Sequence, residues 1–314
     1  MFMKFNLKIY LPALLFLSSC ASKKEPEPQE TQFVDMSELV TQWDDGWVSR
    51  IKEHWTEVEK GNMKVLIYHP HSLADAYQSN LDQGNSDAAD LLVAPYFSDF
   101  TSVQSRGIQS FESITFITAD AIEKENGKPV HLVFFKKHYN SGIGRYLLVV
   151  ADSKASFERE FGNNYINSSS WDYMDQMASW TKLANMQFRN RFGLHAEILQ
   201  GTWSSGSTST LSYYYANGGY AGATGAAVAD EFKFFSNQKY ESVHSGASGI
   251  IGNMQFSKAE YKGNYSIQNW WGLKLTNRFE GTTEDFDGYF EAISKGLLLV
   301  LIDKHQTVTT LAKH

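Results

Sequence analysis

Cysteine is almost absent from the chain, which holds one among 314 residues. A single cysteine excludes an intramolecular disulfide and any zinc site built from several thiolates. Positive charge is also in the minority, because 28 lysines and arginines stand against 35 acids, for a formal net charge of −7. Nucleic acids select basic surfaces, so this charge argues against a nucleic-acid partner.

Charged residues of any sign are few, at 20% of the chain, whereas hydrophobic residues make up 42% and aromatic residues 14%. That composition excludes intrinsic disorder over most of the chain. At a typical ~150 residues per domain, the length predicts about two folded domains.

The N-terminus lacks an apolar run long enough for a permanent membrane helix. Lys4 and Lys8 precede an apolar run over residues 9–17, whereas a membrane helix needs ~20 residues. A short positive segment followed by such a run is typical of a secretion signal, here residues 1–19. The run ends in Leu-Ser-Ser-Cys at residues 17–20, which resembles the bacterial lipobox. The resemblance implies cleavage before Cys20, diacylation of its thiol and acylation of its new amino group.

The alternative is an ordinary secreted protein in which Cys20 is incidental. The sole cysteine stands where the lipobox requires one, which favours lipidation. Two or more acyl chains make membrane attachment stable, at ~0.8 kcal/mol per buried CH₂. Residues 20–37 are polar and proline-rich, so we expect an extended, flexible tether. Ala21 is not an aspartate, which by resemblance disfavours inner-membrane retention and favours an outer-membrane lipoprotein, in the periplasmic or the surface leaflet.

Residues 38–196 alternate strand and helix patterns. Their order of strand, helix, three-stranded meander and helix argues for an antiparallel α+β sandwich. By element order alone, this region resembles the PsbP-like fold. The expected strands are residues 64–69, 111–119, 130–135 and 146–150, and the expected helices are residues 75–92, a serine-capped start at 153–158, and 171–188.

Residues 197–314 change character, because glycine, serine and tyrosine become frequent and apolar residues recur with a period of two. Strands spaced near ten residues with glycine or asparagine turns indicate an all-β barrel, whose interior can hold one ligand. Residues 262–264 (Lys-Gly-Asn) are expected to be a turn. The expected strands are residues 200–204, 210–215, 228–235, 239–244, 253–261, 264–267, 271–276, 285–292 and 297–302.

The segment Gly201-Thr202-Trp203 resembles the opening Gly-x-Trp motif of lipocalin-like barrels, and it precedes the run of strands. In that family the tryptophan closes the barrel floor and a late basic residue packs over it. Arg278 is the candidate for that basic residue. The resemblance implies a lipocalin-like barrel over the C-terminal region.

The mature chain also resembles a group of uncharacterised Bacteroidetes-type lipoproteins. The resemblance lies in the segments Trp-Asp-Asp-Gly-Trp at 43–47, Lys-Val-Leu-Ile at 64–67 and Phe-Glu-Arg-Glu-Phe-Gly at 157–162. That group carries no established activity, so the resemblance implies none here.

Metal, cofactor and catalytic chemistry find little support. His69 and His71, with His131 or His138, are candidate metal ligands, but no carboxylate at ligand spacing completes the set, so no metal or cofactor is expected. The chain has no Gly-x-Ser-x-Gly elbow, and Cys20 is committed to lipid, so no catalytic residue is expected. An envelope hydrolase would require a buried, mutually hydrogen-bonded nucleophile and base, which linear sequence does not reveal.

Aromatic residues at alternate positions of the C-terminal strands indicate either a filled core or the lining of a ligand cavity. The first hypothesis is a non-enzymatic, lipid-anchored envelope protein whose barrel binds a small apolar or amphipathic molecule. Its expected contacts are Trp203, Tyr213, Tyr215, Phe234 and Phe256. The alternative is an interaction scaffold for a protein or glycan partner. Its expected docking residues are the tryptophans Trp43, Trp47, Trp171 and Trp270.

Overall fold

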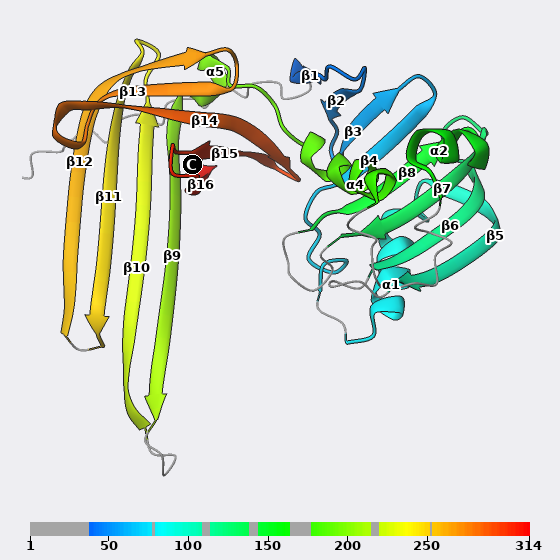
Figure 1. Ribbon diagram of the computed structural model, residues 1–314, viewed down its shortest axis with the longest axis horizontal. Helices are drawn as coiled ribbons and strands as arrows, with labels where there is room; N and C mark the ends of the chain where they lie inside the picture. The colour runs from blue at the N-terminus through cyan, green and yellow to red at the C-terminus, as the bar shows by residue number, and fades with distance from the viewer. Residues whose placement is uncertain are drawn as a thin grey trace, which may run out of the picture. The chain divides into compact units, whose positions relative to one another are not determined.

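The computed structural model describes residues 38–76, 79–108, 114–137, 144–163, 177–214, 220–251 and 253–314. This part of the chain is mostly β, with an antiparallel eight-stranded sheet followed by a closed, antiparallel eight-stranded barrel (Figure 1). Within it, no helix is long and apolar enough to span a bilayer. Cys20 and the expected tether lie outside the described residues.

The N-terminal sheet has the strand order β1-β2-β3-β4-β8-β7-β6-β5. Its strands are β1 Val40–Gln42, β2 Val48–Ile51, β3 Trp55–Lys60, β4 Met63–Tyr68, β5 Phe97–Ile108, β6 Ile114–Glu123, β7 Pro129–Lys136 and β8 Tyr146–Ala151. The helical elements described after β4 are α1 Leu81–Leu92, α2 Lys154–Phe161, α4 Ala178–Ala184, the 3₁₀ helix η4 Asn185–Arg189 and α5 Ala196–Leu199.

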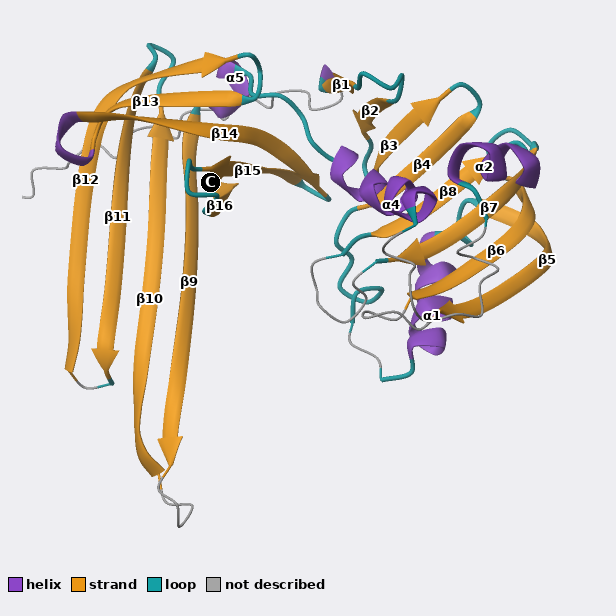
Figure 2. Ribbon diagram, in the orientation of Figure 1, coloured by secondary structure: helices purple, strands orange, loops and turns teal. Residues whose placement is uncertain are grey.

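Helices cover both faces of this sheet (Figure 2). Along β4, Val65 and Ile67 belong to a core shared with α2 and α4, whereas Leu66 and Tyr68 belong to a core shared with α1. Successive side chains of a strand point to opposite faces, so a sheet covered on both sides requires an uninterrupted apolar run. The Val-Leu-Ile segment of β4 supplies that run.

The sequence predicted the central strands of this region, and β4, β7 and β8 are confirmed. The serine cap is confirmed too, since the Ser153 side chain accepts a hydrogen bond from the Ser156 amide. Helix α1 begins at Leu81 rather than at residue 75, because the Asn80 side chain caps it by accepting from the Gln83 amide. Strands β1, β2, β3 and β5 were not predicted, and of the helix expected over 171–188 only the part from residue 177 is described. The PsbP-like likeness stays a prediction.

The barrel has the strand order β10-β11-β12-β13-β14-β15-β16-β9. Its strands are β9 Gly201–Tyr214, β10 Tyr220–Phe234, β11 Lys239–Ile250, β12 Asn253–Gln268, β13 Gly272–Arg278, β14 Thr282–Ile293, β15 Gly296–Ile302 and β16 Val308–Lys313. The short 3₁₀ helix η5, Phe279–Gly281, joins β13 to β14.

The barrel itself was predicted, but several of its strands differ from the expected ones, since β10 begins at Tyr220 rather than residue 228 and β11 ends at Ile250 rather than residue 244. Residues 200–204 and 210–215 were expected to be separate strands, and most of both lies in the continuous β9. The turn expected at residues 262–264 is wrong, because β12 runs through it. Gly263 marks a close approach of backbones there, since a Cβ on it would overlap the Thr276 carbonyl oxygen. Strand β16 was not predicted.

The strands of the barrel differ greatly in length, so it closes at one end only (Figure 1). Strand β16 pairs with β9 at Trp203 and Ser204, and β13 pairs with β12 from Tyr265 onward. We call this end the closed half. The remaining parts of the long strands, residues 205–214, 220–229, 245–250 and 253–258, continue past it as a four-stranded extension, here called the blade.

The closed half holds the core of the barrel. Its buried inward side chains are large, and they include Trp203, Phe232, Phe234, Tyr240, Tyr265, Leu273, Leu275, Phe290, Leu299 and Leu311. The blade has no comparable core among its described side chains. Val228 is 55% exposed, Ile250 61% and Phe256 82%.

Candidate functional site

Trp203 fills the end of the closed half at which β9 begins. Its ring stacks on Phe290 with ring centroids 5.6 Å apart, and its indole N–H donates to the Leu199 carbonyl oxygen at 2.7 Å. The Lys313 ammonium lies 5.3 Å from the centre of the Trp203 ring and donates to the Ile198 carbonyl oxygen at 2.7 Å. The late basic residue over the tryptophan is therefore Lys313, and the assignment of Arg278 to that position was wrong.

Of the residues expected to contact a ligand, only Trp203 and Phe234 share a core among the described side chains. Phe234 packs edge-on against Tyr265 in that core, with ring centroids 5.3 Å apart. Phe256 lies an odd number of residues from the inward-facing Tyr265 on β12, so its side chain points to the outer face. The backbone of Tyr213 belongs to β9, but its side chain and all of Tyr215 lie outside the described residues.

Above the aromatic core lies a layer of hydrogen-bonded polar side chains that we call the charged layer: Asp230, Ser242, His244, Arg278 and Glu284. Asp230 and His244 are cross-strand partners on β10 and β11, and the His244 Nδ1 lies 2.7 Å from the Asp230 Oδ1. The Arg278 Nη1 donates to the His244 Nε2 at 2.8 Å and to the Ser242 Oγ at 2.9 Å. The Arg278 Nε donates to the Glu284 Oε2 at 2.7 Å.

The geometry of this layer fixes the hydrogen on His244. A guanidinium group only donates hydrogen bonds, so the His244 Nε2 facing Arg278 must be an acceptor. The imidazole is then neutral, and its Nδ1–H donates to Asp230. Arg278 is also surrounded by the rings of Phe232, Tyr261 and Phe279, whose centres lie 5.4, 5.1 and 4.9 Å from its guanidinium carbon.

The serine, histidine and aspartate of the charged layer have the connectivity of a catalytic triad. The Ser242 Oγ lies 3.2 Å from the His244 Nε2, and His244 in turn contacts Asp230. However, the Arg278 Nη1 bonds to both Ser242 and the base nitrogen, and Ser242 is 2% exposed. A nucleophile needs a base free to accept its proton and a path for substrate. The arrangement therefore orients fixed charges rather than activating Ser242.

The charged layer is partly exposed, and two of its members, Asp230 and His244, adjoin the blade along β10 and β11. The Arg278 side chain is 4% exposed, whereas those of His244 and Glu284 are each 22% exposed and that of Asp230 is 30% exposed. Phe279, which packs edge-on against Tyr261, is 49% exposed. A molecule arriving along the inner face of the blade thus meets Asp230 and His244 first, with aromatic surface beside them.

Sequence reasoning missed this layer, because its members are distant in the chain. Asp230 and His244 are brought together by the register of β10 and β11, and Arg278 comes from β13. One local signal was present. Asp230 alternates with the apolar Phe232 and Phe234 on one face, which places a charge at an inward position of a strand.

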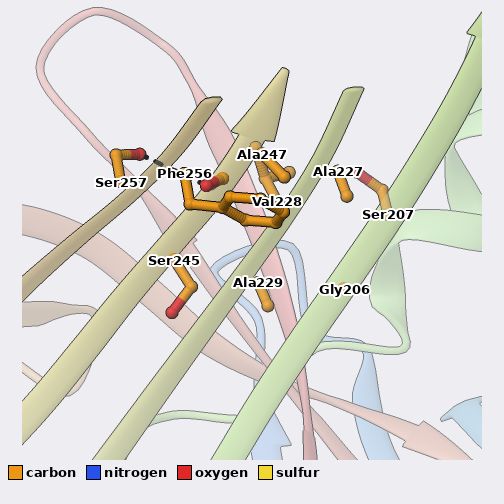
Figure 3. Close-up of a pocket in the computed structure, with 10 residues that line it drawn as sticks. Gly206, Ser207, Ala227, Val228, Ala229, Ser245, Ala247, Phe256 and Ser257 are labelled. Atoms are coloured by element: carbon orange, nitrogen blue, oxygen red, sulfur yellow. Dashed lines mark hydrogen bonds between the residues drawn. The ribbon is translucent and has the colours of Figure 1, made fainter. Parts of the chain in front are cut away.

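The blade carries a shallow groove of about 530 Å³. Its lining side chains are mostly small, and the Phe256 ring extends from β12 over this surface (Figure 3). The residues that line it are Gly206, Ser207, Ala227, Val228, Ala229, Ser245, Gly246, Ala247, Phe256 and Ser257.

The histidines considered for metal binding have other partners. His69 is buried with its Nδ1 3.3 Å from the Glu53 carbonyl oxygen, and burial lowers its pKa to about 4. The His131 Nδ1 lies 2.8 Å from the Asp120 Oδ1, and His71 accepts a hydrogen bond from the Ala74 amide. Within the described residues, no three His, Cys, Asp or Glu side chains form a metal-binding group. His138 lies outside those residues.

The tryptophans considered for docking differ in their exposure to solvent. Trp47 is fully buried in the core of the N-terminal sheet, so its expected exposure was wrong. Trp270 is 60% exposed and its neighbour Trp271 is 38% exposed. Trp43 is partly buried against the same core as Trp47, and Trp171 lies outside the described residues.

Comparison with known proteins adds no assignment. No family model matches the chain, and no curated protein matches it significantly. The functional argument therefore rests on the geometry of the barrel.

Proposed function

We propose that the chain is a lipid-anchored protein of the outer membrane that binds a small amphipathic molecule at the mouth of its barrel. The observation that carries the proposal is the charged layer, which lies directly over an aromatic core and is partly exposed where it adjoins the blade. Ligand sites combine apolar walls with a few convergent polar groups, and the mouth offers both.

The charges of the layer indicate what kind of head group fits. With His244 neutral, the single cation Arg278 faces the two carboxylates of Asp230 and Glu284. The layer thus carries a net negative charge, and Asp230 is its most exposed anion. We expect a ligand whose amine or hydroxyl group donates to Asp230 while its apolar part lies on Tyr261 and Phe279.

Acylation of Cys20 is part of the same proposal, because a lipid anchor holds the barrel next to the membrane, where amphipathic molecules concentrate. Incorporation of labelled palmitate tests it directly. The unaltered chain should take up label and fractionate with outer membranes, and Cys20→Ser should do neither. A soluble, unlabelled wild-type chain would refute the anchor.

Native mass spectrometry after mild purification tests the ligand site. The wild type should carry an added mass that Asp230→Asn loses. Asp285→Asn is the matched control, because the Asp285 side chain is 66% exposed and forms only a surface ion pair with Lys274 at 3.5 Å. Asp285→Asn should retain the added mass. A wild-type barrel that is empty in every preparation, or equal retention by both variants, would contradict the proposal.

The scaffold hypothesis keeps one specific observation in its favour. Asn269 and Trp270 both have positive φ, at 50° and 65°, in the turn between β12 and β13. Non-glycine residues held in that region are strained, and such strain clusters at binding sites. If Trp270 docks a protein or glycan, Trp270→Ala should abolish crosslinking to that partner in cells and leave the added mass of the barrel unchanged.

A further inference from the structure

The blade has two free edges. Strand β9 pairs with β10 along its length, but its other side pairs with β16 at Trp203 and Ser204 only. Strand β12 pairs with β11 from Asn253, but its other side meets β13 only from Lys262 onward, where the Asn277 side-chain amide donates to the Lys262 carbonyl oxygen. Among the described residues, β9 beyond Ser204 and β12 before Lys262 thus have no strand partner on their outer sides.

These edges lack the features by which single-chain proteins protect exposed strands. Natural edge strands carry charges, prolines or bulges, or are very short. Residues 204–229 and 245–257 contain no Asp, Glu, Lys, Arg, His or Pro. The charged residues of β12 begin at Lys258, close to the closed half. The outer parts of both edges are therefore long and uncharged.

The two edges have the strand directions that antiparallel pairing requires, and their uncharged parts lie at the same height along the sheet. Strands β9, β10, β11 and β12 pair antiparallel in succession, so β9 and β12 of one chain run in opposite directions. When β12 of one copy lies beside β9 of the next, the alternating ladder continues without a break. One cross-strand row joins Ser209, Ala226, Ser248 and Gln255, so the uncharged parts of the two edges stand at the same height.

The geometry points to a second copy of this chain as the occupant of each edge, with β12 of one copy pairing with β9 of the next. Because different edges meet, the contact is head-to-tail and repeats from copy to copy. Such pairing satisfies the hydrogen-bonding groups of the backbone at both edges. It also extends the blade into a wider sheet, in which the side chains of Val228 and Phe256, exposed on opposite faces of one chain, have the next copy beside them. This inference is independent of the ligand at the barrel mouth.

A charge swap at the two edges tests the contact. Ser209 and Gln255 lie in one row but three strand spacings apart, roughly 14 Å, which exceeds the ~10 Å Debye length at 0.1 M salt. The variant Ser209→Lys/Gln255→Lys opposes like charges at every junction, whereas Ser209→Lys/Gln255→Glu opposes unlike charges. Sedimentation of the full chain carrying Cys20→Ser should show a wild-type oligomer. The dissociation constant of the oligomer formed by the first variant should be at least about tenfold higher than that of the oligomer formed by the second.

Ala226→Lys is the matched control for the added charge, because Ala226 lies in the same row on β10, a strand that is paired on both sides within one chain. It should associate like the wild type. A wild type that is monomeric at every soluble concentration, or equal dissociation of the two charge variants, would overturn the inference. So would a chain that binds lipid vesicles as a monomer and does not self-associate on them.

Crosslinking distinguishes this contact from pairing of two identical edges. In the Cys20→Ser chain, Ser207→Cys and Ser257→Cys each place one thiol on the inward face of β9 and β12, respectively. A mixture of the two variants should form disulfide-linked dimers on oxidation, whereas either variant alone should not. Dimers formed by Ser207→Cys alone would show that β9 pairs with β9 and would refute the head-to-tail contact.

Discussion

The closed half and the blade share strands β9 to β12, yet among the described side chains only the closed half has a core. On β10 the inward residues Phe232 and Phe234 are buried, whereas Val228, on the same face, is 55% exposed. The backbone ladder continues unchanged through both regions, with β10 and β11 paired from Phe234 and Tyr240 to Thr224 and Ile250. Hydrogen-bonded pairing thus extends well beyond the region in which side chains are withdrawn from water.

This contrast separates two roles within one barrel. Burial of apolar area is the main favourable term in folding, so the closed half supplies the stability of the barrel. The blade buries little within one chain and must depend on the ladder that continues from the closed half. Substitutions in the closed half should therefore change stability, and those in the blade should change association.

The largest expected effect is that of Trp203→Ala. Its indole is fully buried, stacks on Phe290 and donates to Leu199, so its removal leaves a cavity and an unmet carbonyl. We expect a loss of about 3–5 kcal/mol in the free energy of unfolding, measured by denaturant titration. Phe256→Ala on the blade removes a side chain that is 82% exposed and should change stability by less than about 0.5 kcal/mol. Equal losses would erase the distinction between the two regions.

The next effect is that of Arg278→Met, which removes the only cation of the charged layer. The variant leaves the Glu284 carboxylate without its Arg278 donor, and the His244 Nε2 keeps only the Ser242 hydroxyl as a neighbour. Breaking a buried pair in this way costs about 3–5 kcal/mol, and the partial exposure of Glu284 reduces that to about 2–3 kcal/mol. Lys274→Met, on the same strand β13, breaks the surface pair with Asp285 and should cost less than about 1 kcal/mol. A small effect of Arg278→Met would mean that water already solvates the layer.

Glycines provide a comparison without any change of charge. A Cβ at Gly263 would overlap the Thr276 carbonyl oxygen and lie 3.0 Å from the Tyr240 ring, so Gly263→Ala must push β12 away from β13. We expect a loss of about 1–3 kcal/mol. At Gly206 on the blade, the nearest atom to an added Cβ is the Val228 carbonyl oxygen at 3.8 Å, an ordinary contact. Gly206→Ala should change stability by less than about 0.5 kcal/mol, and a large loss there would indicate hidden packing on the blade.

The sequence predicted those parts of the fold that depend on local pattern. The Ser153 cap, the apolar run of β4 and the aromatic alternation of β10 are read from neighbouring residues, and each corresponds to an element of the structure. Strand β9 was divided in two, because residues 205–209 carry only serine, threonine and glycine. Hydrophobic alternation reveals a strand only where one face is buried, and most of the described side chains of the blade are exposed.

The candidate site escaped prediction for a different reason. The charged layer depends on the register of β10 and β11 and on Arg278 from β13, and register is not determined by any short stretch of sequence. The wrong assignment of Arg278, rather than Lys313, as the basic residue over Trp203 has the same origin. The basic residue over Trp203 comes from β16, a strand in which polar residues outnumber the single buried Leu311.

The smallest effect concerns the pH dependence of Lys313. Burial beside Trp203 lowers the pKa of this ammonium from its ordinary 10.5. Just below pH 10.5 the unfolded chain therefore binds more protons at this site than the folded chain does, and the free energy of unfolding rises with pH. Lys313→Met leaves the Ile198 carbonyl oxygen without its donor and should cost about 0.5–1 kcal/mol at neutral pH. The stability of the wild type relative to Lys313→Met, measured by denaturant titration, should then increase toward pH 10.5. A decrease would mean that attraction to the Trp203 ring outweighs the burial of the charge, and that the floor of the closed half is wetter than its packing indicates.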